Sequence, residues 1–223
     1  MTETLTVDVI SDVVCPWCYI GQKRLDRAAA LVPEIDLTIR WRPYQLDPTI
    51  PQGGVDRREY MMAKFGSAEK LKDIHGRVKG VGADEGIDFR FEDIAVSPNT
   101  LDAHRVIRWA QGAGVQHEVV KELFSTFFEK GADIGDAAVL AEAAGRAGMD
   151  ATLVATLLPT PADRDEVRGE IETASRMGVT GVPCFLIESR YAVMGAQDAE
   201  TLADALRQIA GAKARGELDG AAG

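Results

Sequence analysis

Residues 5–18, LTVDVISDVVCPWC, decide the fold of this chain. Residues 5–10 alternate between apolar and polar side chains and are rich in β-branched types, which predicts a strand. Cys15 and Pro16 then open a helical pattern, because proline fits the first turn of a helix, where its missing N–H would have had no partner. A strand is therefore expected to lead directly into a helix that carries two cysteines at its N-terminus.

The two cysteines, Cys15 and Cys18, are separated only by Pro16 and Trp17. Free amide groups and the positive end of the helix dipole favour a thiolate over a thiol at the position of Cys15. Cys18 would lie about one turn further along, close enough to bridge the first sulfur. The pattern predicts thiol–disulfide exchange, with Cys15 as the nucleophile and Cys18 as the thiol that resolves a mixed disulfide.

Two other interpretations of the pair stay open. The cysteines could be half of a zinc site, completed by Cys184 and by one of His75, His104 or His117. They could also be two buried cysteines without a chemical role. The chain has no second close cysteine pair, and a helix start with proline and tryptophan between the cysteines is a poor zinc knuckle, so we expect no metal.

A second motif, GVTGVP at residues 178–183, precedes an apolar run that predicts a strand. Proline is tolerated at the first residue of a strand, and it is the residue before which a cis bond costs least. In a sheet of the expected type this loop lies beside the helix with the thiol pair. The backbone of Val182 would then be free to pair with an extended substrate, with Pro183 shaping the groove. An ordinary trans turn is the alternative.

Composition restricts the partners. The chain has 223 residues, 25 basic and 35 acidic side chains, and therefore a net charge of −10. Such a chain repels phosphate backbones, so we expect no nucleic-acid partner.

Residues 1–14 contain no Lys or Arg, and no apolar stretch approaches the roughly 18 residues of a membrane span. Three cysteines make no disulfide framework. We expect a cytoplasmic protein without a membrane partner; the oligomeric state stays open.

The order of expected elements indicates an α/β fold. A strand at 36–42 is expected to follow the first helix. The last part of the chain is expected to form a helix starting at Thr160-Pro161, strands at 182–187 and 191–194, and a helix from Asp198, before a tail that frays from Ala210. No strand is expected between residues 55 and 159. Expected helices there span residues 57–65, 68–79, 100–111, 115–130, 136–147 and 150–157. We predict a thioredoxin-like βαβ…αββα domain, residues 1–52 and 161–223, and a large all-helical insertion, residues 53–160.

Several segments resemble the DsbA-like thioredoxin-fold oxidoreductases, and specifically their FrnE-like branch. They are SDVVCPWCYIG at 11–21, WRPYQLDP at 41–48, SPNT at 97–100 followed by AHR at 103–105, GVTGVP at 178–183, and Gly195 with Gln197. The resemblance implies a thioredoxin fold interrupted by a helical domain, a cis bond before Pro183, and exchange through Cys15 and Cys18. It also implies protein or small-molecule thiols or disulfides as substrates, no tightly bound cofactor, and glutathione as a candidate co-substrate.

A related branch shares this architecture, namely the kappa-class glutathione transferases and hydroxychromene-carboxylate isomerases. The chain resembles that branch most at Asn99-Thr100, but the branch typically carries Ser-Pro-Tyr-Ser-like residues where this chain has two sulfurs. Redox exchange is therefore preferred, with a glutathione-dependent transferase or isomerase as the alternative. Oxidation, reduction and isomerisation of disulfides all stay open as directions.

Six further residues are candidates for a role at the site, and most of them carry two interpretations. His104 could stabilise a thiolate or pack as a hydrogen-bonded histidine, and Asp12 could oppose the thiolate or lie in a solvated turn. The Asn99–Thr100 pair is expected to cap the following helix, with a polar substrate contact as the lesser alternative. Cys184 is expected to be a small buried strand residue, and otherwise a third thiol that traps or regulates a mixed disulfide. Trp17 is expected to be exposed beside the sulfurs, where it could contact an apolar partner.

Overall fold

The computed structural model describes residues 3–218. Its main sheet has the order β2-β1-β5-β6 and is formed by β1 (Glu3–Ser11), β2 (Ile35–Pro43), β5 (Cys184–Ile187) and β6 (Tyr191–Met194). β1 is parallel to β2 and antiparallel to β5, and β6 closes an antiparallel hairpin with β5. The predicted α/β class and thioredoxin-like fold are thereby confirmed.

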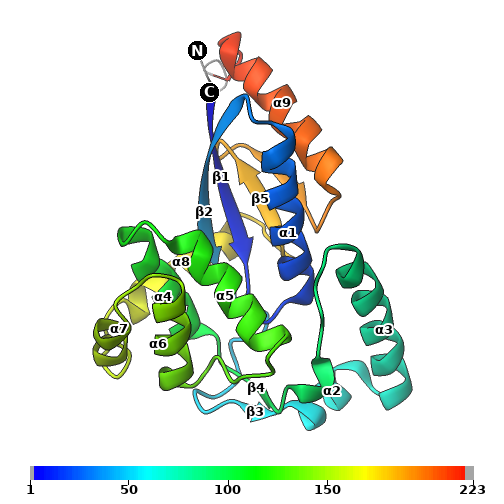
Figure 1. Ribbon diagram of the computed structural model, residues 1–223, viewed down its shortest axis with the longest axis vertical. Helices are drawn as coiled ribbons and strands as arrows, with labels where there is room; N and C mark the ends of the chain where they lie inside the picture. Colours follow the sequence, from blue (N-terminus) through cyan, green and yellow to red (C-terminus); the bar gives the residue numbers. More distant parts are fainter. Residues whose placement is uncertain (1–2, 219–223) are drawn as a thin grey trace.

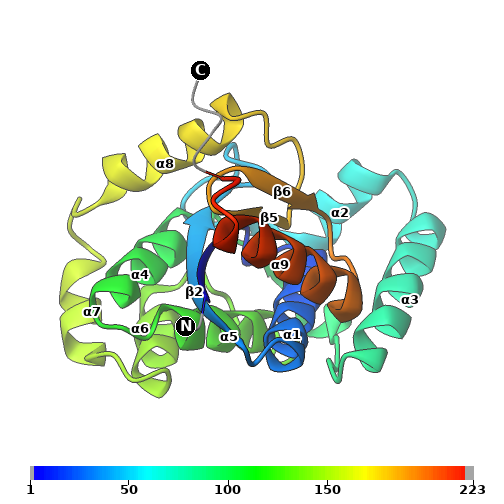
Figure 2. The ribbon, with the colours of Figure 1, turned by 90° about the horizontal axis from the view of Figure 1, so that it is seen from above.

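Helices cover both faces of this sheet (Figures 1 and 2). α1 (Pro16–Leu31) packs beside α9 (Ala199–Ala214), and α8 (Arg164–Arg176) lies on the opposite side of the sheet (Figure 2). Between β2 and α8 the chain forms α2 (Arg57–Phe65), α3 (Ala68–Asp84), α4 (Leu101–Gly112), α5 (Gln116–Phe128), α6 (Ala137–Arg146) and α7 (Ala151–Leu157). In Figure 1, α3 and the α4–α7 group flank the N-terminal end of α1 from two sides, so the insertion surrounds the cysteine pair.

The central position of β1 explains why its C-terminal half is buried. Val7 and Val9 are buried, because neighbouring strands and helices cover both edges and both faces of this strand. The register pairs Ile10 with Cys184 on one side and Ser11 with Pro43 on the other. The segment that follows Ser11 therefore leaves the sheet where three strands meet, and this fixes the start of α1.

The insertion is not all-helical, which corrects one expectation. β3 (Val55–Asp56) and β4 (Val96–Ser97) form a short antiparallel ladder, and a single 3-10 turn spans Phe91–Asp93. Strands of two residues are too short to show an alternating pattern, so nothing in the sequence indicated them. The proposed domain division at residues 52/53 and 160/161 stays a prediction.

Several expected boundaries also moved. The helix expected at 68–79 continues to Asp84, and the helix expected at 115–130 spans Gln116–Phe128. α8 begins at Arg164 rather than at Thr160, because the Thr160 hydroxyl donates to the Leu157 carbonyl and accepts from the Ala162 N–H in a separate turn. The strand expected from residue 182 begins at Cys184. α9 continues through residue 210 to residue 214, so the tail does not fray where expected; residues 219–223 lie outside the described part.

A buried cation joins the insertion to the second half of the chain. Arg105 of α4 is 0% exposed, forms an ion pair with Asp102, and donates to main-chain carbonyls in the turn after α7. These acceptors are the carbonyls of Leu157, Leu158, Thr160 and Ala162. The Leu157 carbonyl also accepts from Thr160, whereas Arg105 is the donor to the carbonyls of Leu158, Thr160 and Ala162, which lie beyond the last turn of α7.

Replacing Arg105 should destabilise the protein strongly. We expect Arg105→Met to lower the free energy of unfolding by about 2–5 kcal/mol, because several buried carbonyls lose their donor. Urea denaturation followed by circular dichroism measures the change. Arg168→Met is the matched control: it removes an arginine from an exposed pair with Asp165 and should shift stability by less than about 0.5 kcal/mol. Equal midpoints for both variants would contradict the assigned role of Arg105.

Candidate active site

Cys15 occupies the N-cap of α1, with Pro16 at the first helical position, as expected from the sequence. Its N–H donates to the Asp12 carbonyl at 3.0 Å, and its own carbonyl accepts from the N–H of Cys18, also at 3.0 Å. The side chain is 5% exposed. The sulfur therefore stands at the positive end of the dipole of a 16-residue helix.

The thiol faces the proline loop. The Cys15 Sγ lies 3.8 Å from the carbonyl oxygen of Val182, and the Val182–Pro183 bond is cis, as the resemblance implied. One turn further along α1, a Cβ at Gly21 would lie 2.9 Å from Cγ of Pro183, which is closer than real Cβ atoms approach. The helix and the loop can pack this closely because residue 21 has no side chain.

Cys18 lies below Cys15 and is completely buried. Burial raises the pKa of the Cys18 thiol well above its ordinary value, and the hydrogen bond and charge of Cys15 raise this pKa further. The Ser11 hydroxyl and the Asp12 main chain act in the opposite direction but are weaker. All three cysteines of the chain are free thiols. The two sulfurs are therefore adjacent, and the inner one is held in its protonated form.

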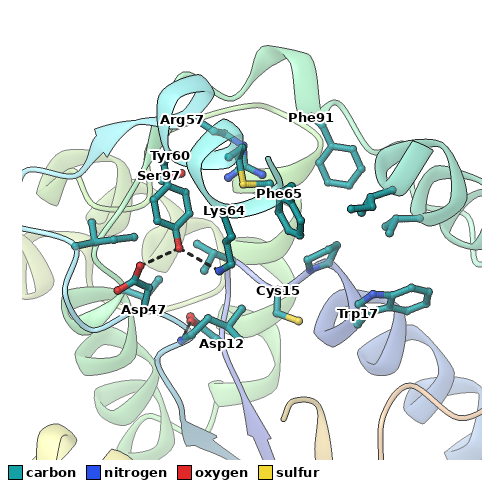
Figure 3. A pocket seen from close by; sticks show the side chains of 18 of the residues that line it. Asp12, Cys15, Trp17, Asp47, Arg57, Tyr60, Lys64, Phe65, Phe91 and Ser97 are labelled. Atoms are coloured by element: carbon teal, nitrogen blue, oxygen red, sulfur yellow. Dashed lines mark hydrogen bonds between the residues drawn. The ribbon is translucent and has the colours of Figure 1, made fainter. Parts of the chain in front are cut away.

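A pocket of about 390 Å³ opens beside Cys15, between the start of α1 and helices α2 and α3 (Figure 3). Its wall is mainly apolar and includes Val14, Leu46, Ile50, Met61, Phe65, Ile74, Val78, Phe91, Pro98 and Val182. Trp17 stands at the mouth and is 42% exposed, as predicted. The sequence interpretation missed the contributions of α2 and α3; their only signal was the helical pattern at 57–65 and 68–79, which does not say what those helices face.

Polar side chains form one connected chain in this pocket. Tyr60 Oη donates to a carboxylate oxygen of Asp47 at 3.0 Å, and the Lys64 ammonium donates to Tyr60 Oη at 3.1 Å (Figure 3). Hydrogen bonds from Thr49, and then from Tyr60, hold the pKa of the Asp47 carboxyl below its ordinary value. This carboxylate therefore stays charged, with its partners already in place.

Asp12 and His104 contact each other instead of solvent. Asp12 is buried; one carboxylate oxygen accepts from the Leu46 N–H at 2.8 Å, and the other lies 3.4 Å from His104 Nε2. That nitrogen is also 2.8 Å from the Tyr44 carbonyl. The geometry matches the interpretation of His104 as a packing histidine, since it lies behind Asp12 and not among the residues that line the pocket. Asp12 does line the pocket and is not a solvated turn residue.

Asn99 connects the insertion to the segment after β2. Its side-chain oxygen accepts from the N–H of Leu101, in the first turn of α4, and from Gln45, while its amide donates to the Ile50 carbonyl. The capping role is therefore observed for Asn99; the Thr100 side chain does not cap the helix. Cys184 is buried at the start of β5, and burial raises the pKa of its thiol, which agrees with a small buried strand residue.

The zinc alternative lacks its donor set in the part of the chain that is described. Across residues 3–218, no three His, Cys, Asp or Glu side chains come together as metal ligands. Of the histidines proposed as ligands, His104 bonds to the Tyr44 carbonyl, His117 pairs with Asp26, and the ring of His75 stacks on Phe91. Within the same residues, no helix has both the length and the apolar character needed to cross a membrane.

Known proteins resemble this chain over most of its length. A family model described as a DSBA-like thioredoxin domain matches residues 6–207. The Uncharacterized protein YwbO of Bacillus subtilis (strain 168) is 27% identical over 192 residues, 82% of this chain and 87% of YwbO. The probable DsbA oxidoreductase SCO1869 from Streptomyces coelicolor is 32% identical, with a TM-score of 0.84 over 92% of this chain and 89% of that chain. The cytosolic disulfide reductase DsbM from Pseudomonas aeruginosa, solved with GSH, shares the fold at 17% identity, with a TM-score of 0.63 over 92% of this chain and 98% of its own.

The three thiols should differ sharply in reactivity. With iodoacetamide at pH 7, Cys15 should be alkylated first, because its sulfur borders the pocket, whereas burial blocks Cys18 and Cys184 and raises the pKa of both thiols. Alkylation of the two buried thiols should keep accelerating as the pH rises, because a raised pKa leaves most of each thiol protonated and its thiolate fraction still increasing. Peptide mass spectrometry after short labelling measures the order. Labelling of Cys18 before Cys15 would contradict this assignment.

Proposed function

Since this chain belongs to the DsbA-like thioredoxin domain family, we propose that it is a thiol–disulfide oxidoreductase or disulfide isomerase that works through the Cys15–Cys18 pair. One observation carries the proposal. The Cys15 sulfur lies at the N-terminus of α1, facing the Val182 carbonyl, with the protonated thiol of Cys18 directly behind it. This is the arrangement that two-step exchange requires.

In the first step the Cys15 thiolate attacks one sulfur of a substrate disulfide. A bond forms between Cys15 and that sulfur, the substrate S–S bond breaks, and the other substrate sulfur leaves as a thiolate that takes up a proton. In the second step Cys18 loses its proton and its sulfur attacks Cys15, which releases the second substrate thiol. The substrate disulfide gains two electrons, and the protein dithiol becomes a disulfide. The reverse sequence oxidises a substrate dithiol.

Electrostatics supports this order of attack. The charge of Cys15 is one cause of the raised pKa of the Cys18 thiol. Once Cys15 is held in a mixed disulfide, that charge is gone and this contribution to the pKa of Cys18 disappears. Cys18 therefore stays protonated while Cys15 attacks and becomes easier to ionise when its own attack is due.

The groove between Trp17, Val182 and Pro183 is the proposed substrate site, for a protein or a small-molecule thiol or disulfide. We propose glutathione as a candidate co-substrate, which the solved complex of DsbM with GSH makes worth testing, and no tightly bound cofactor. The cytoplasm as compartment and the FrnE-like branch stay predictions. The net charge of −10 argues against a nucleic-acid partner.

A glutathione-dependent transferase or isomerase is the second candidate. The observation in its favour is the largely apolar pocket of about 390 Å³ beside Cys15, which is large enough for an aromatic compound. This candidate predicts turnover of such a compound with glutathione that continues after Cys18 is replaced.

Insulin reduction with dithiothreitol tests the leading candidate. We expect Cys15→Ser to lower the rate by about 100-fold or more, because the attacking sulfur is lost. Cys18→Ser should stop at a mixed disulfide that intact-mass spectrometry detects. Cys184→Ser, the control, should keep most of the activity because that thiol is buried in β5. Full activity of Cys15→Ser would end the proposal.

A further inference from the structure

One charged side chain of the pocket has no partner. Arg57, the first residue of α2, is 8% exposed, and its main-chain N–H donates to the Ala95 carbonyl. Its guanidinium lies over the ring of Phe127, 5.4 Å from the centroid. Within residues 3–218 the guanidinium makes neither a hydrogen bond nor an ion pair, and burial lowers the pKa of Arg57 to about 10. Burying a cation in this way costs free energy, which the contact with the Phe127 ring offsets only in part.

The position of Arg57 in α2 makes this cost larger. The N-terminus of a helix is the positive end of its dipole, where a cation is disfavoured and an anion is stabilised. Helix stability therefore cannot explain an arginine at this position. The Asp56 carboxylate already caps this helix terminus by accepting from the Glu59 N–H, so it is the buried guanidinium that a negative group in the pocket would compensate.

Two further groups of the same pocket that can donate a hydrogen bond are unsatisfied. Ser97 is 3% exposed, and its buried hydroxyl has no hydrogen-bond partner among the described residues. The β3–β4 ladder pairs Ser97 with Val55, two residues before Arg57. Nε2 of His75 is likewise buried without a partner among those residues. Burial and the nearby charge of Arg57 lower the pKa of His75, so this ring is neutral at pH 7 and able to donate one N–H.

The pocket therefore has two chemically different ends. Figure 3 shows Arg57 and Phe91 projecting from the insertion, with Cys15 and Trp17 on the opposite side. The wall between them is mainly apolar. The carboxylates of the pocket form no ion pair with Arg57 among the described residues. Asp47 accepts hydrogen bonds from Thr49 and Tyr60. Asp12 accepts from the Leu46 N–H through one oxygen, and its other oxygen lies 3.4 Å from His104 Nε2 without a hydrogen-bond partner.

We propose that this pocket takes a low-molecular-weight disulfide whose apolar body carries a carboxylate, with the carboxylate on the Arg57 guanidinium and the Ser97 hydroxyl and a sulfur within reach of Cys15. Arginine and a hydroxyl are suitable donors to a carboxylate, and an apolar wall suits an aromatic or aliphatic body. The assignment rests on the proposed exchange at Cys15 and adds a substrate class to it. The bonds formed and broken are those of the two steps described above.

Two aromatic disulfides of different charge test the proposal in the reduced protein. 5,5′-Dithiobis(2-nitrobenzoate) carries a carboxylate on each ring, whereas 4,4′-dithiodipyridine carries none. The stopped-flow rate with each is measured, and the rate of Cys15→Ser is subtracted. Arg57→Met should slow the carboxylate probe about tenfold relative to the neutral probe. Arg58→Met is the matched control, since it removes the same charge from the exposed neighbouring residue, and it should leave the ratio unchanged.

A binding measurement separates this proposal from the exchange chemistry. In calorimetry, the Cys15→Ser variant should bind 2-naphthoate more tightly than 2-naphthamide. Adding Arg57→Met to this variant should remove the preference for the carboxylate over the amide. Ser97→Ala should reduce it in part, which covers the case in which Arg57→Met fails to fold. Equal binding of acid and amide, or a rate ratio that Arg57→Met does not change, would overturn the carboxylate site. If neither disulfide reacts while naphthoate still binds through Arg57, the proposed exchange fails and the carboxylate site stands.

Discussion

The close contact between the N-terminal turns of α1 and the Val182–Pro183 loop is the constraint on which the rest of the site depends. A Cβ at Gly21 would lie 2.9 Å from Pro183, and the Cys15 sulfur lies 3.8 Å from the Val182 carbonyl. The pairing of β1 with β5 fixes the position of α1 relative to the proline loop. Ile10, near the end of β1, pairs with Cys184, the first residue of β5 after the loop. Thiol, helix terminus and substrate groove therefore form one unit, although 167 residues separate Cys15 from Val182 in the chain.

Burial then gives two chemically identical side chains different properties. Cys15 borders the pocket, whereas Cys18 is enclosed and its thiol pKa is raised. The same effect applies to Cys184, which the sheet encloses. Asp12 is also buried, but one oxygen of its carboxylate accepts a hydrogen bond from the Leu46 N–H, and the other lies 3.4 Å from His104 Nε2. Arg57 lacks such partners, and this difference singles it out.

The insertion adds recognition to a fold that already holds the sulfur chemistry. α2 and α3 form the wall of the pocket opposite Cys15, and Arg105 fixes α4 to the turn that leads into α8. Strong local patterns made the insertion helices predictable, but their packing partners were not. The two-residue strands β3 and β4 were missed for the same reason, since their pairing depends on residues about 40 positions apart and leaves no period in the sequence.

Local signals in the sequence were enough to predict the strand–helix junction, the two sulfurs at a helix N-terminus and the proline that opens β5. The conformational preferences of proline, the spacing of the cysteines and the alternation of a strand each involve only a few neighbouring residues. Only the tertiary structure decided which residues surround those sulfurs. Packing brings together the segments that make these contacts. It places His104 against Tyr44 and Asp12, and it lets the Asn99 amide donate to the Ile50 carbonyl. It also places Arg57 at the pocket without a partner among the described residues. Hydrogen bonding and burial are properties of that environment, and a linear pattern carries no record of them.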